Sequence, residues 1–225
     1  MRIGLEISPS NGGHRLNGQW WRSYAFAIRL AACFFFNTLA TVYVLFFERS
    51  APTVNLIWVS NGVLITYLLL APRWRWPAYL IAGIAGMTFG SVLIGEPRNT
   101  IFLYNVLNLV EVMIGAFFLR TKSTQLPRFT DRRYLLKFVG FAVLAGPIVA
   151  GLLLLLVMQI WKHAAQPKIF LDWVIGDGLG TAVIVPTFAA IFATRFRDFA
   201  SLRKHWQYPF LLVAVTVAAF SQNRM

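Results

Sequence analysis

The sequence predicts an all-α fold, a polytopic transmembrane helix bundle with six full spans and an incomplete seventh. Three observations lead to this prediction. Of the 225 residues, 58% are hydrophobic and 13% charged, with a mean hydropathy of +0.62, whereas roughly 25% of an ordinary soluble domain is charged. The apolar residues gather in runs long enough to cross a bilayer as helices. Lys and Arg lie in clusters between those runs, mostly on one side of the expected membrane.

The chain divides into a polar lead over residues 1–23 and a membrane domain over residues 24–220. The first apolar run is too long for a signal-peptide core and no cleavage site follows it, so we expect a retained helix. The complete spans are expected at about Tyr24 to Phe47, Val54 to Ala71, Trp76 to Ile94, Ile101 to Leu119, Phe138 to Trp161 and Phe170 to Ala193.

A seventh apolar run begins at Pro209, and the dozen or so residues that follow are too few to cross a bilayer. We therefore expect this element to be incomplete and any output domain to be absent from the sequence. Proline removes a helical donor and crowds the preceding turn, so Gly146-Pro147 and Pro186 are expected to bend the fifth and sixth spans.

The distribution of basic residues predicts the orientation. The lead and the second, fourth and sixth connections hold fifteen Lys and Arg, against four on the other side, namely Arg49, Arg98, Lys162 and Lys168. Cytoplasmic loops carry such an excess, so the N-terminus is expected in the cytoplasm. The formal net charge of +13 is thus explained by topology rather than by nucleic-acid binding, which needs one continuous basic face.

Ile101 to Arg120 is the stretch that we expect at the centre of the bundle. It is apolar, yet it carries Asn105, Asn108 and Glu111, which are spaced three apart and form one polar stripe on a helix. A carboxylate inside a span is costly and almost always faces a bundle interior or a wet cavity. The stripe should therefore have partners in other spans.

Asn61, Asn108 and Asp177 come out roughly 10 Å below the outer surface at 1.5 Å per residue, and Glu111 roughly 15 Å. We predict that these four residues form an intramembrane layer that senses a ligand or a proton. The alternative is that they only join helices, each contributing about 1 kcal/mol. That alternative suits the asparagines better than the carboxylates, because helix association does not need a charge.

No motif in the sequence supports catalysis, a metal site or a cofactor site. There is no nucleophile–base pair, phosphate loop or HExxH, so we expect no catalytic residues and no enzyme. The three histidines are dispersed, and Cys33 is the single cysteine, so no metal site is expected. The glycine-rich segment around Asp177 has no preceding strand, which argues against a dinucleotide loop. Gly86 with Gly90, and Gly176 with Gly180, are spaced for close helix contact instead.

Four motifs in order resemble the bacterial membrane-associated sensor domain of the first MASE class, over roughly Val54 to Pro186. They are Ile57-Trp58-Val59-Ser60-Asn61-Gly62; Arg75-Trp76-Pro77; Leu107-Asn108-Leu109-Val110-Glu111 with Gly115 and Leu119-Arg120; and Trp173, Asp177, Gly180 and Pro186. The resemblance implies a multi-span input module of usually about eight helices in the bacterial inner membrane. Such modules are joined to diguanylate cyclase, phosphodiesterase or histidine kinase outputs. This chain departs from the pattern by ending within its seventh run.

By resemblance, the chain regulates a cytoplasmic signalling output, above all cyclic-di-GMP synthesis. Two other functions stay open: a small transporter or channel, which would also place carboxylates and Gly-Pro breaks in its spans, and a structural anchor or localisation module. The expected partners are the lipid bilayer, a small ligand or another membrane protein, and a second copy of the chain in a homodimer. No nucleic acid is expected.

Overall fold

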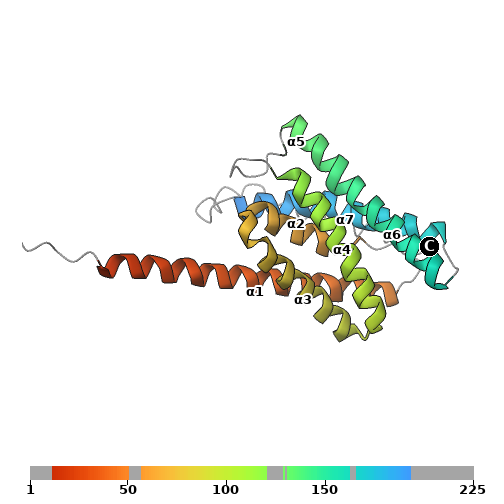
Figure 1. Ribbon diagram of the computed structural model, residues 1–225, viewed down its shortest axis with the longest axis horizontal. Coiled ribbons are helices and arrows are strands. Elements are labelled where there is room, and N and C mark those ends of the chain that lie inside the picture. Colours follow the sequence, from red (N-terminus) through yellow and green to blue (C-terminus); the bar gives the residue numbers. More distant parts are fainter. Residues whose placement is uncertain (1–11, 51–56, 121–128, 130, 163–165, 194–225) are drawn as a thin grey trace, which may run out of the picture.

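The computed structural model describes residues 12–50, 57–120, 129, 131–162 and 166–193, and every regular element among them is helical (Figure 1). The α-helices are α1 (Gly12–Ser50), α2 (Ser60–Leu70), α3 (Trp76–Ile94), α4 (Arg98–Leu119), α5 (Arg132–Lys137), α6 (Gly146–Lys162) and α7 (Pro167–Ala193). A 3-10 turn, η1 (Arg73–Arg75), precedes α3, and a π-helix, η2 (Phe138–Ala145), joins α5 to α6. The predicted all-α membrane fold is confirmed.

Five helical segments are long and apolar enough to cross a membrane: Tyr24–Arg49, Arg73–Ile94, Arg98–Leu119, Arg132–Trp161 and Pro167–Ile191. They match the first, third, fourth, fifth and sixth predicted spans. The seventh run, from Pro209, lies outside the described residues.

The second predicted span is not a full-length helix. Its helix, α2, has 11 residues and begins only at Ser60, after a non-helical segment over Ile57–Val59. At 1.5 Å per residue it is about 16 Å long, which is roughly half of the hydrocarbon core. Hydropathy could not reveal this difference, because an apolar segment has the same composition whether or not it is helical.

The short helix α2, rather than α4, is the centre of the bundle. Every residue from Ser60 to Leu69 is buried, and α2 packs against α7, α4, α1 and α3. A helix that is hydrophobic all round is stable only when other helices surround it. The predicted central stretch, Ile101 to Arg120, corresponds to α4, which lies beside α2 and buries one face against it.

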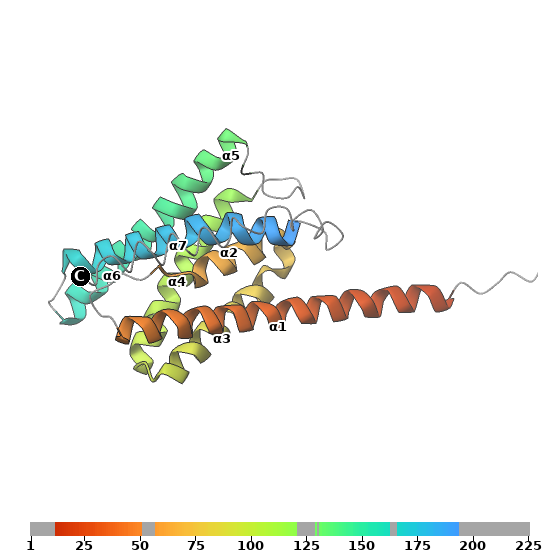
Figure 2. The ribbon, with the colours of Figure 1, turned by 180° about the vertical axis from the view of Figure 1, so that it is seen from behind.

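α1 and α3 share the most extensive contact among the described helices, and glycines let them approach. A Cβ added at Gly86 would collide with the Phe34 carbonyl oxygen, and one added at Gly90 would lie 2.9 Å from the Thr38 carbonyl oxygen. The Thr38 hydroxyl donates to the Gly86 carbonyl at 3.1 Å. The predicted close contact at these glycines is therefore present. The N-terminal part of α1 runs well beyond the other helices (Figure 2).

The fifth span contains a rare widening of the helix. Pro147 has no N–H to donate and its ring crowds the turn before it. The turns ahead of Gly146-Pro147 form the π-helix η2, in which the Gly146 N–H bonds to the Phe141 carbonyl, five residues back. Pro186 lies inside α7, which continues through it.

An arginine side chain makes a contact between helices at each end of the bundle. At one end, which we call the Glu96 end, Arg49 at the close of α1 forms an ion pair of 2.8 Å with Glu96 in the α3–α4 connection. At the opposite end, which we call the Arg120 end, the Arg120 guanidinium donates to the carbonyl of Leu69 in the last turn of α2. If the N-terminus is cytoplasmic, as the excess of Lys and Arg predicts, the Glu96 end faces the outside of the cell.

Candidate functional site

The four predicted layer residues come together where the first turn of α2 meets α4 and α7. The Asn61 side-chain amide Nδ2 donates to Asn108 Oδ1 at 3.1 Å and to Asp177 Oδ2 at 3.2 Å. All of them are nearly inaccessible: Asn61 and Glu111 are 0% exposed, Asn108 3% and Asp177 5%. A single amide therefore bridges two helices that are far apart in the sequence.

Glu111 is the least satisfied group of this layer. Its carboxylate lies beside the side chains of Asp177, Asn61 and Trp173. Neither carboxylate oxygen meets full hydrogen-bond geometry with a described donor, although the Asn61 amide, the Trp173 indole and the Asp177 carboxyl lie near enough for weaker hydrogen bonds. A buried polar group without a partner is costly, and a carboxylate more so than an amide. The described ion pairs involve other residues, so no Lys or Arg in them neutralises Glu111 or Asp177.

The layer lies at the N-terminus of α2, and this position matters electrostatically. The residue before the helix, Val59, has no side chain that could cap the first turn. The N-terminus of a helix carries a partial positive charge because its first N–H groups have no partner within the helix. Asp177, held by Asn61 in the first turn of α2, is thus next to a site that favours negative charge.

Close contact between the backbones of α2 and α7 positions the layer. The Trp58 N–H donates to the Gly176 carbonyl at 3.1 Å, which ties the segment before α2 to the residue before Asp177. At Gly180, an added Cβ would collide with the Trp58 carbonyl oxygen. The predicted close approach at Gly176 and Gly180 is therefore made to the non-helical segment before α2.

The π-helix η2 and the first residue of α6 form another wall of the site. A Cβ added at Gly146 would lie 3.1 Å from Glu111 Cγ, and one added at Gly178 would lie 2.8 Å from the Val143 carbonyl oxygen. The fifth span thus contacts Glu111 on α4 and Gly178 on α7, the residue that follows Asp177. π-helical turns inside α-helices frequently occur at functional sites.

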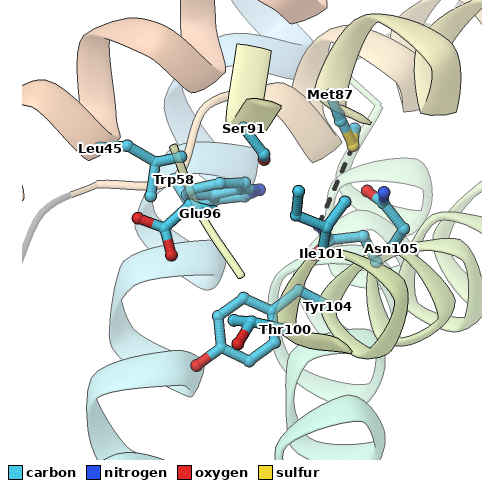
Figure 3. A pocket seen from close by; sticks show the side chains of 10 residues that line it. Leu45, Trp58, Met87, Ser91, Glu96, Thr100, Ile101, Tyr104 and Asn105 are labelled. Atoms are coloured by element: carbon cyan, nitrogen blue, oxygen red, sulfur yellow. Dashed lines mark hydrogen bonds between the residues drawn. The ribbon is translucent and has the colours of Figure 1, made fainter. Parts of the chain in front are cut away.

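A small pocket lies between the layer and the Glu96 end, and Figure 3 shows the side chains around it. Its volume is about 20 Å³. The lining residues come from α1, the segment before α2, α3, the α3–α4 connection and α4: Leu45, Trp58, Met87, Ser91, Glu96, Thr100, Ile101, Tyr104, Asn105 and Asn108. Asn108 belongs to both the pocket and the layer.

Two residues near the layer differ from the sequence-based prediction. Asn105, part of the predicted stripe, donates to Thr88 on α3 at 2.9 Å and not to the layer. Trp173 was not predicted as a site residue, yet it lies beside Glu111 and its ring packs edge-on against Tyr104, with centroids 5.4 Å apart. Its position four residues before Asp177, on the same helix face, was the available signal.

Comparison with known proteins gives one match. The family model MASE1, which describes a membrane-associated sensor domain, matches residues 27–221. No curated protein and no solved structure matches the chain.

Proposed function

Because the chain belongs to the MASE1 family and is therefore a multi-pass membrane sensory input domain, we propose that it regulates cyclic-di-GMP synthesis from the bacterial inner membrane. In this proposal the N-terminus is cytoplasmic, the chain itself catalyses no reaction, and the output is a cytoplasmic cyclase domain. We further propose that Asn61, Asn108, Glu111 and Asp177 are the sensing layer.

The observation that supports this proposal is the weakly paired Glu111 beside the hydrogen-bonded group Asn108–Asn61–Asp177. Two carboxyl groups this close bind a proton or a cationic ligand as a unit, because two neighbouring negative charges in a low dielectric repel each other. Binding of a proton or a cation to this pair then weakens the repulsion between Glu111 on α4 and Asp177 on α7.

In this proposal the change travels through the π-helix η2, which packs against both carboxylate-bearing helices, α4 and α7. π-helical turns are rare and frequently occur at functional sites. α7 runs from the layer toward the Arg120 end, the side that we place in the cytoplasm. A ligand or proton that favours one packing of these helices shifts the population of signalling states.

The test replaces each carboxylate by its neutral isostere at the natural gene locus, so that whatever follows the codon for Met225 is retained. Glu111→Gln and Asp177→Asn both imitate the protonated form. They should change intracellular cyclic-di-GMP in the same direction, by about fivefold or more, the lower end of ordinary coupling between sites. The response to external pH should also be lost.

Asp172→Asn is the matched control, because it makes the same carboxylate-to-amide change on α7 in a side chain that pairs with Lys168 outside the layer and the pocket. It should leave cyclic-di-GMP unchanged. Unaltered cyclic-di-GMP in both carboxylate variants, at normal membrane levels of protein, would refute the role of the layer.

One observation favours a transporter as the second candidate. α2 is a half-length helix whose N-terminus lies beside buried polar groups, as in the discontinuous helices of transporters. Proteoliposomes that accumulate protons or cations only when Glu111 is intact would support this candidate over the sensor.

A further inference from the structure

The pocket at the Glu96 end reaches the buried layer through one side chain. Asn108 lines the pocket, and its Oδ1 accepts the hydrogen bond from Asn61, whose amide also binds Asp177. The amide nitrogen of Asn108 faces the Met87 sulfur at 3.9 Å, a weak contact that Figure 3 marks with a dashed line. Only two hydrogen bonds therefore separate the pocket wall from the Asp177 carboxylate.

The size and lining of the pocket select water as its occupant. A volume of about 20 Å³ holds one water molecule, since a water needs roughly 10–15 Å³ of this kind of volume. Ser91, Thr100, Asn105 and Asn108 supply hydroxyl and amide groups, which meets the need of a buried water for two to four polar partners. An organic solute does not fit.

Trp58 is placed to control passage from this pocket to the layer. Its ring lies among the pocket residues, and its indole nitrogen is buried without a hydrogen-bond partner in the described residues (Figure 3). Its backbone is held by Gly176 and Gly180 of α7, which flank Asp177. A change in the charge of Asp177 that shifts α7 therefore shifts the Trp58 ring as well.

Few charged or titratable groups lie between the Glu96 end and the two carboxylates. At the Glu96 end of the pocket these groups are Glu48 and Arg49 of α1, Glu96 of the α3–α4 connection and Tyr104 of α4. The carboxylates themselves are Glu111 on α4 and Asp177 on α7. Their other neighbours carry no charge: Asn61 on α2, Trp173 on α7 and Gly146 on α6. Protons that enter from the Glu96 end thus meet no charged group between Glu96 and the carboxylates among the described residues that line the route.

We propose that this pocket is the water-filled entry by which the Glu111–Asp177 pair exchanges protons with the Glu96 side of the membrane, with Trp58 as its gate. The inference rests on the proposed sensing layer. A proton leaves a hydronium ion in the pocket and joins a carboxylate oxygen of the pair, and the water formed returns to the pocket. Amides hold water but do not relay protons well, so the Trp58 ring and Asn108 must move to let water pass.

The experiment measures hydrogen–deuterium exchange of the protonated carboxyl group by infrared spectroscopy on the intact chain in lipid bilayers. The carboxyl C=O band is assigned by its loss in Glu111→Gln or Asp177→Asn. Ser91→Leu and Thr100→Leu fill the pocket from α3 and α4 and should slow exchange by at least about tenfold, because exchange then needs local opening of the helices. Trp58→Ala should accelerate it by a similar factor.

Val92→Leu places a leucine one residue further along α3, where the side chain is 57% exposed and does not line this pocket. Its carboxyl exchange rate should equal that of the wild type. Wild-type exchange in both filled variants overturns the proposal, and so does the absence of any band that the two isosteres remove. These results are independent of cyclic-di-GMP levels. If the carboxylate variants alter the output while pocket filling leaves exchange unchanged, only the entry route is wrong.

Discussion

At the scale of single residues, the polar groups in the layer differ in how well they are satisfied. Asn61 donates to two acceptors, so its removal would leave Asn108 Oδ1 and Asp177 Oδ2 without a donor. Glu111 has no donor in full hydrogen-bond geometry among the described residues, so its removal would take away a weakly paired buried carboxylate. Two substitutions of similar size and burial should therefore have different effects on stability.

Asn61→Leu should lower the free energy of unfolding by about 2 kcal/mol, within the cost of leaving buried acceptors unpaired. Glu111→Leu should leave it unchanged or raise it, because a weakly paired buried charge is replaced by an apolar side chain. Thermal unfolding of the purified chain in one detergent measures both variants. Equal destabilisation by the two would mean that the contacts of Glu111 with its neighbours Asn61, Trp173 and Asp177 stabilise the fold after all.

At the scale of secondary-structure elements, glycines decide how closely the segment before α2 approaches α7. Gly180 meets a backbone carbonyl, which cannot move aside as a flexible side chain can. Gly140, in the π-helix, has no atom within 4 Å of an added Cβ and serves as its matched control. The same substitution thus tests close packing at one position and helix propensity alone at the other.

Gly180→Ala should destabilise the chain by about 2 kcal/mol or more, in the range of overpacked cores. Gly140→Ala should be neutral or stabilising by about 0.5–1 kcal/mol, because alanine favours a helix over glycine. Thermal unfolding and the yield of folded protein in size-exclusion chromatography report both. A neutral Gly180→Ala would show that the Trp58 segment is not held against α7 in the membrane.

At the scale of the whole molecule, sidedness determines which compartment the pocket faces. Asn99 is exposed at the Glu96 end, and Trp74, 72% exposed, lies at the Arg120 end. The only native cysteine, Cys33, is fully buried and should not interfere with thiol labelling. Single cysteines at the two exposed positions therefore report the orientation of the bundle.

A membrane-impermeant maleimide should label Asn99→Cys in intact spheroplasts, because the excess of Lys and Arg places that end outside. Trp74→Cys should be labelled only after the membrane is permeabilised, and the unmodified chain should stay unlabelled in both conditions. The reverse labelling pattern would place the Glu96 end, and with it the pocket, on the cytoplasmic side of the membrane.

The sequence by itself determined the fold class, the positions of five apolar helices and the grouping of Asn61, Asn108, Glu111 and Asp177, which lie together in the structure. Hydropathy and helix rise are properties of each segment alone, so they can be read without knowing its neighbours. The family resemblance followed from motifs within those segments, and the family match confirmed it.

Tertiary structure alone decided that α2 is half-length and central, that Asn105 pairs with Thr88, and that Trp173 lies beside Glu111. Each of these depends on which backbone or side chain arrives from another helix. The start of α2 at Ser60 goes with the bond from Trp58 to Gly176, more than a hundred residues away. Periodicity within one segment carries no information about such partners, because the same apolar pattern suits a helix, a helix fragment or an extended strand of buried chain.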